Sequence, residues 1–150
     1  MSDDKNSLAI SLFSEVLAAD QMIRNRLHRV LPKGMEISHF SVLNHLAWHE
    51  GERSPAQLAE TFNVTRGAMT YTLNRLEWAG YVHIRPDWDD ARRKMVALSP
   101  AGRRARDQAL SAIAPMVSDV IDKLGEGAVR ATVPILRQMR AELSDKVKPD

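Results

Sequence analysis

Residues 54–82, SPAQLAETFNVTRGAMTYTLNRLEWAGYV, decide the fold of this chain. The opening Ser54-Pro55-Ala56-Gln57 predicts a helix start, because serine can cap a helix, proline fits the first helical position and glutamine can close a capping box. Asn63-Val64 then predicts a turn, and Thr65 predicts the cap of a second helix with Gly80 just past its end. Two short helices joined by a tight turn form a helix-turn-helix.

The hydrophobic period changes directly after this motif. Tyr81–Arg85 alternates, Pro86–Arg93 is polar and charged, and Met95–Leu98 again favours a strand. This pattern predicts a β-hairpin around a charged loop. We therefore expect a winged helix-turn-helix lobe plus a helical dimerisation region, in a fold that is mainly α with a small β-hairpin wing (α+β).

The second helix of the motif has an apolar face and a polar face. Four apolar residues have core-facing spacing: Ala68, Met69, Leu73 and Leu76. The opposite side carries Arg66, Thr70 and Asn74 at i, i+4 and i+8, flanked by Gly67, Tyr71 and Arg75. Such a stripe offers the donors, acceptors and apolar edges that major-groove reading requires. An ordinary amphipathic helix with a polar outer face is the alternative.

Helical patterns precede this region. Apolar spacing predicts a first helix that stops before Pro32, and Ser38 predicts the start of a second helix that Gly51 ends. The apolar positions of these two helices are Leu8, Leu12, Phe13, Val16, Ala19, Ile23, Leu27, Val30, Val42, Leu43, Leu46 and Ala47.

Two more helices follow the hairpin. Ser99-Pro100 repeats the signal of a cap followed by proline, while Gly125 and Gly127 predict a break before the last helix. Pro115 and Pro134 each predict a kink, because the apolar spacing resumes in phase after them. The apolar positions here are Leu110, Ile113, Val117, Val120, Ile121, Leu124, Val129, Val133, Leu136, Met139, Leu143 and Val147.

The 150 residues have the length of one domain, contain no cysteine and carry a net charge of +2. The lack of cysteine excludes thiolate metal sites, cysteine nucleophiles and disulfides. Between Arg53 and Arg106, ten Lys/Arg stand against five acidic residues. This basic middle suggests a site for a polyanion, with nucleic acid the default candidate, and a solvated charged surface is an equal alternative from charge alone. With no signal peptide and no apolar run long enough for a membrane span, we expect a cytoplasmic protein without a membrane partner.

Three motifs carry a resemblance to a known family. They are Ser54-Pro55-Ala56-Gln57-Leu58-Ala59, Leu73-Asn74-Arg75-Leu76-Glu77-x-x-Gly80-Tyr81-Val82 and Asp87-x-x-Asp90-x-Arg92-x-x-x-Val96-x-Leu98-Ser99-x-x-Gly102. Through them the chain resembles the MarR family, the multiple-antibiotic-resistance-type regulators. The wing departs from the family's pattern at Ala91, where a second arginine is usual, and at Trp88, where a proline is frequent.

The resemblance implies a homodimeric transcriptional regulator on a pseudo-palindromic operator in double-stranded DNA. It implies a repressor that a small aromatic or phenolic effector releases. A single MarR-type domain would then have dimerisation helices at 1–32 and 100–150 and a DNA-binding lobe at 36–99, with the effector between them. The apolar excess of the terminal helices independently favours a partner chain over a monomeric bundle.

We expect the caps, the helix stripe and the wing to contact DNA. Arg92 is predicted to be the main wing contact, because Asp90 can hold its guanidinium in a fixed direction. The predicted DNA-binding residues are Ser54, Thr65, Arg66, Gly67, Thr70, Tyr71, Asn74, Arg75, Asp90, Arg92, Arg93 and Lys94.

Other constellations are weaker. His45 and His49 have a spacing that can chelate a metal, but no third ligand pairs with them, so a solvated or effector-pocket face is favoured. Trp48 between them can pack or stack on an aromatic effector. The sequence has no phosphate loop, nucleophile elbow or catalytic carboxylate pair, so we expect no enzyme, no cofactor and no metal. A winged-helix module for protein or RNA contacts is the alternative function.

Overall fold

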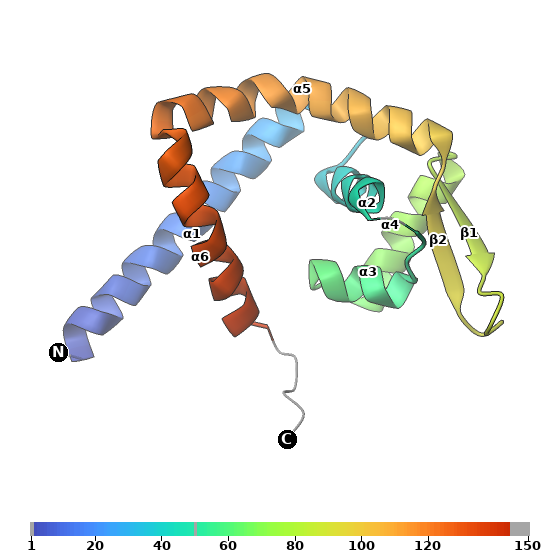
Figure 1. The fold of residues 1–150 in the computed structure, drawn as a ribbon, viewed down its shortest axis with the longest axis horizontal. Helices are drawn as coiled ribbons and strands as arrows, with labels where there is room; N and C mark the ends of the chain where they lie inside the picture. The colour runs from blue at the N-terminus through green and yellow to red at the C-terminus, as the bar shows by residue number, and fades with distance from the viewer. Residues whose placement is uncertain (1, 50, 145–150) are drawn as a thin grey trace. The chain divides into compact units, whose positions relative to one another are not determined.

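The computed structural model describes residues 2–49 and 51–144 (Figure 1). The elements in this part of the chain are α1 (Ser2–Val30), α2 (Ile37–Trp48), α3 (Pro55–Phe62), α4 (Arg66–Trp78), β1 (Val82–Pro86), β2 (Lys94–Leu98), α5 (Pro100–Leu124) and α6 (Glu126–Glu142). They confirm the expected fold class of helices with a small hairpin. The chain divides into two compact units, residues 1–113 and 114–150.

The local signals of the helix-turn-helix are confirmed. Ser54 Oγ accepts a hydrogen bond from the Gln57 N–H at 3.1 Å, and the Ser54 N–H donates to Gln57 Oε1 at 2.9 Å. Together they close the capping box of α3. Thr65 Oγ1 accepts from the Ala68 N–H at 3.1 Å and caps α4. Asn63, at φ +51°, makes the left-handed turn between the two helices.

The core of the first unit lies among α2, α3, α4 and the hairpin. Its most deeply buried side chains are Val42, Leu43, Leu58, Leu73, Val82 and Val96. The prediction that Ala68 faces this core is wrong, because Ala68 is exposed and Thr72 is buried instead. The inward stripe of α4 is Met69, Thr72, Leu73 and Leu76. Successive helical residues point about 100° apart, so a stripe centred on Met69 leaves Ala68 outside it.

The hairpin packs on the helix-turn-helix through a third extended segment. β1 and β2 pair antiparallel, from Val82 opposite Leu98 at the base to Pro86 opposite Lys94 near the loop. Arg53, in the α2–α3 connection, exchanges two backbone hydrogen bonds with Val96, at 3.1 Å and 2.7 Å. The base of the wing is thereby joined to the segment that leads into α3.

The start of α5 is fixed by a close backbone approach. Ser99 Oγ donates to the Gly80 carbonyl at 2.6 Å and accepts from the Gly102 N–H at 2.9 Å. A Cβ at residue 102 would lie 2.0 Å from the carbonyl oxygen of Tyr81, so only glycine fits there. The predicted signal at Ser99-Pro100 is confirmed, and Gly102 is required by this contact.

Two predicted boundaries are wrong. α2 begins at Ile37 instead of Ser38, because Glu36 occupies the N-cap and its N–H donates to His39 Nδ1 at 3.1 Å. Gly127 lies inside α6, and Gly125 alone, at φ +91°, separates it from α5.

The two interior prolines do not end their helices. Pro115 lies inside α5 and Pro134 inside α6. Val147, predicted as the last apolar position of the final helix, lies outside the described residues. No helix within 2–49 and 51–144 is long and apolar enough to cross a membrane.

Candidate nucleic-acid interface

The outward face of α4 is open along its length. All six residues of the predicted stripe and its flanks are exposed: Arg66, Gly67, Thr70, Tyr71, Asn74 and Arg75. Two of them are fixed relative to each other, since Arg75 Nη1 donates to Tyr71 Oη at 3.2 Å and the guanidinium carbon lies 5.7 Å from the Tyr71 ring centroid. The face therefore combines an amide, hydroxyls and two guanidinium groups, the groups that can read base edges.

The side-chain hydroxyls of the two cap residues already accept backbone hydrogen bonds at the starts of α3 and α4. Ser54 is 5% exposed, and its hydroxyl is engaged in the capping box. Thr65 is exposed, but its Oγ1 accepts the cap hydrogen bond. The structure thus gives both residues a capping role, and their contact with DNA stays a prediction.

The wing loop presents one oriented arginine. Arg92 Nε donates to Asp90 Oδ1 at 3.1 Å, and the Arg92 backbone N–H donates to the same oxygen at 3.0 Å. These hydrogen bonds, from the side chain first and then the backbone, lower the pKa of Asp90, so its carboxylate stays ionised. The Arg92 side chain is nevertheless 92% exposed and open to a partner. Arg93 and Lys94 are exposed beside it.

The structure also shows an attachment of the wing that the sequence analysis missed. Arg85 of β1 donates from Nε and Nη2 to Glu52 Oε1, at 3.1 Å and 2.7 Å. The partners are 33 positions apart in the chain, a separation that leaves no periodic signal. Arg85 fits the alternation of Tyr81–Arg85, so the strand pattern gave no hint of this ion pair.

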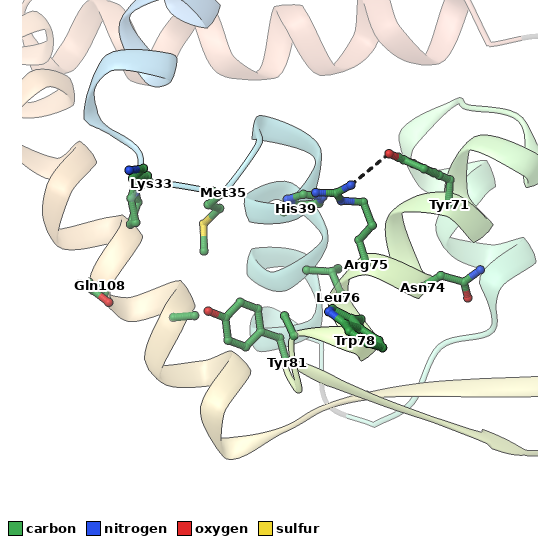
Figure 2. A pocket seen from close by; sticks show the side chains of 14 residues that line it. Lys33, Met35, His39, Tyr71, Asn74, Arg75, Leu76, Trp78, Tyr81 and Gln108 are labelled. Carbon is green, nitrogen blue, oxygen red and sulfur yellow. Dashed lines mark hydrogen bonds between the residues drawn. The ribbon is translucent and has the colours of Figure 1, made fainter.

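A second missed feature is a pocket of about 550 Å³ in the first unit (Figure 2). Its lining residues come from the α1–α2 connection, α2, α4, the segment before β1 and the first part of α5. Tyr81, Trp78 and Met35 contribute aromatic and apolar walls, while Lys33 and Arg75 bring positive charge. Figure 2 shows that Arg75 and Tyr71, hydrogen-bonded to each other, stand at the edge of this pocket. The pocket and the outward face of α4 therefore share three side chains, those of Tyr71, Asn74 and Arg75.

His39, which lines the pocket, has a buried ring nitrogen without a hydrogen-bond partner among the described residues. It is 6% exposed, and its Nδ1 accepts the Glu36 N–H. Burial lowers the pKa of His39 most strongly; the charge of Glu36 raises this pKa and the charge of Arg75 lowers it. The net lowering leaves the ring neutral near pH 7. A neutral ring that accepts at Nδ1 carries its proton on Nε2. This buried Nε2–H has no hydrogen-bond partner within residues 2–49 and 51–144.

His45 and His49 do not complete a metal site. Their ring centroids are 4.3 Å apart, and the His45 ring meets Phe62 edge-on at 5.6 Å. Burial, and next the proximity of His49, lower the pKa of His45. The part of the chain that the structure describes contains no group of three metal-binding side chains. Trp48, between the two histidines, is 75% exposed and does not line the 550 Å³ pocket.

Comparison with known proteins agrees with this geometry. Residues 33–93 match the model of the MarR family. Over 145 residues the chain is 26% identical to the uncharacterized HTH-type transcriptional regulator YdgG of Bacillus subtilis, with 95% of each chain covered.

Solved structures share the fold. One is a mutant of MarR from E. coli complexed with operator DNA (TM-score 0.76, 23% identity, 87% of this chain and 94% of that chain). Another is BpsR of Bordetella bronchiseptica, whose DNA binding is regulated by 6-hydroxynicotinic acid (TM-score 0.75, 20% identity, 85% of this chain and 91% of that chain).

Proposed function

We propose that this chain, whose residues 33–93 match the model of the MarR family, binds double-stranded DNA as a homodimer and represses transcription. This match and the operator-bound structural neighbour favour a transcriptional regulator over an enzyme. The observation that carries the DNA proposal is the exposed polar stripe of α4 beside an exposed, oriented Arg92. The stripe would read bases in the major groove, and the wing would contact the backbone and the minor groove. Because it acts on the chromosome, we expect it in the cytoplasm.

Homodimer formation is supported by apolar faces on the terminal helices. On α1 the exposed apolar side chains are Leu8, Ile10, Leu12, Phe13, Leu17, Met22 and Ile23. On the C-terminal half of α5 and on α6 they are Val117, Val120, Leu124, Val133, Ile135, Leu136 and Leu143. No described residue of α6 is buried within the single chain. Apolar surface on this scale favours a partner, and a second copy is the partner that two-fold symmetric operators require.

Release by an effector is supported by the pocket. Aromatic walls, two cations and the His39 Nε2–H donor suit a small phenolic molecule that carries an anionic oxygen. Because Tyr71 and Arg75 belong both to the pocket and to the α4 face, a ligand there would move side chains that DNA needs. The similar fold of BpsR, with its aromatic regulator, supports this assignment.

The test is selection of bound duplexes from a random pool, followed by titration of the best sequence. We expect a pseudo-palindromic site whose binding weakens when 4-hydroxybenzoate or a related phenolic acid is added. Failure to enrich any duplex, with binding of structured RNA or a protein instead, would favour the alternative function.

A further inference from the structure

An ion pair joins the wing to the α2–α3 connection, directly before the helix-turn-helix. Neither of its residues belongs to the predicted DNA-contacting set. Arg85 uses Nε and Nη2 on Glu52 Oε1, and its Nη1 donates to the Pro86 carbonyl at 2.8 Å. The two charged side chains are 33% and 28% exposed. All three nitrogens of this guanidinium thus donate a hydrogen bond within the protein.

The same guanidinium supports a tryptophan of the wing loop. The Arg85 guanidinium carbon lies 4.8 Å from the centroid of the Trp88 ring, a cation–π contact. The hydrogen bonds of arginine lie in the plane of its guanidinium, so its face remains free to stack. Trp88 is otherwise 84% exposed. A continuous series of contacts therefore runs from Glu52 through Arg85 to the loop that carries Arg92.

Other contacts of the wing fix its base and its internal shape. The Arg53–Val96 bridge joins the middle of β2 to the α2–α3 connection. In the loop, the Asp87 N–H donates to the Arg93 carbonyl at 2.9 Å, and the Arg93 N–H donates to the Asp90 carbonyl at 2.9 Å. Arg85 lies opposite Met95, nearer to the loop than Val96 is. The Glu52–Arg85–Trp88 series thus attaches the wing at a point nearer to its loop than the Arg53–Val96 bridge does.

We propose that Glu52, Arg85 and Trp88 form a brace, a series of contacts that fixes the direction of the wing. Arg92 is then already oriented toward DNA before binding. The three are positioning residues, and the proposal rests on the proposed DNA-binding function. A wing that moves freely must be ordered when DNA binds, and this ordering costs affinity. Loss of the brace should therefore weaken DNA binding because Arg92 is no longer held in place. The brace residues themselves need not contact DNA.

The experiment uses the full chain, a duplex selected by it, and the variants Trp88→Ala, Arg92→Ala and their combination. Trp88→Ala removes no charge and leaves the Glu52–Arg85 pair in place. We expect it to weaken binding about three- to five-fold, and Trp88→Phe, which keeps a ring for stacking, to restore most of that loss. In the Arg92→Ala background, Trp88→Ala should add little, because residues that act through one contact are not additive.

Salt dependence provides a second readout. If the brace delivers Arg92 to the phosphate backbone, Trp88→Ala should flatten the slope of log affinity against log salt by up to about one unit, although no charge is lost. Trp48→Ala is the matched control, since Trp48 is also exposed and has the Arg106 guanidinium 5.9 Å from its ring, but it lies off the wing. It should bind like the wild type.

Three results would overturn the brace. These are unchanged binding by Trp88→Ala, fully multiplicative losses in the double variant, and a loss that Trp88→Phe does not recover. In each case a wild type that binds its duplex and an Arg92→Ala variant that binds it less would leave the proposed function standing. A wild type that binds no duplex would overturn both.

Discussion

Arg75 and Tyr71, one turn apart on α4, form a hydrogen-bonded pair that belongs both to the outward face of α4 and to the lining of the pocket. The 3.2 Å bond from Nη1 to Oη holds the two side chains together at the outward face of α4, and both also line the 550 Å³ pocket. Under the proposed function, a ligand in that pocket and DNA on α4 would compete for these two side chains.

Arg92→Ala should weaken operator binding while the dimer stays folded. A lost arginine contact to DNA typically costs about 1–3 kcal/mol, or roughly 5- to 150-fold in affinity. The salt slope should flatten by about one unit if Arg92 neutralises a phosphate. Titrations at several salt concentrations measure both quantities. Unchanged affinity at every salt concentration would indicate that Arg93 and Lys94, and not Arg92, make the wing contact.

Substitution of Thr70 or Tyr71 should change which operator variants are preferred. Both side chains are exposed on α4, where they would meet base edges. Thr70→Ala and Tyr71→Phe, assayed against a panel of single-base operator variants, should alter the order of affinities. An equal loss on all sequences would make these residues backbone contacts that only position the helix.

Light scattering at micromolar concentration should give about twice the chain mass of 16.8 kDa. Leu136→Glu places a charge on the apolar face of α6 and should shift the protein toward monomer, because burying an unpaired carboxylate at an interface is costly. Gln138→Glu adds the same charge off that face and should leave the dimer intact. A wild-type mass near 16.8 kDa would contradict the homodimer.

His39→Phe should reduce the response to a phenolic acid while operator binding without ligand is kept. The substitution removes the Nε2–H donor from the pocket but leaves the exposed α4 face in place. His49→Phe, on an exposed residue outside the pocket, is the control. The measurement is the ligand concentration that halves operator binding. An equal response of both variants would remove His39 from the effector site.

The free energy of unfolding should fall as the pH drops below the ordinary histidine pKa of 6.5. Burial lowers the pKa of His39 in the folded chain, so the unfolded chain binds more protons in this range, and acid favours unfolding. Burial acts on His45 with the same sign. His39→Gln should therefore reduce the pH dependence without abolishing it. Urea unfolding between pH 7.5 and 5.5 measures the slope, and an unaltered slope in the variant would assign the effect elsewhere.

The sequence by itself determined the elements whose signals act over a few residues. The capping box of Ser54 and Gln57, the Thr65 cap and the left-handed Gly80 all depend on contacts within about four residues, and each is where the sequence placed it. The wing followed from the same kind of local evidence, a change of period around a charged loop. Short-range hydrogen bonds form in the same way whatever the rest of the chain does.

How those elements meet follows from contacts between residues that are far apart in the sequence. The rotation of α4 exposed Ala68 and buried Thr72, because periodicity fixes the width of an apolar stripe but not its centre against neighbours. The Glu52–Arg85 pair joins residues 33 positions apart, and Gly102 is needed only because α5 passes against the Tyr81 carbonyl. Such contacts depend on the packing of separate elements, where distance along the chain carries no information about distance in space.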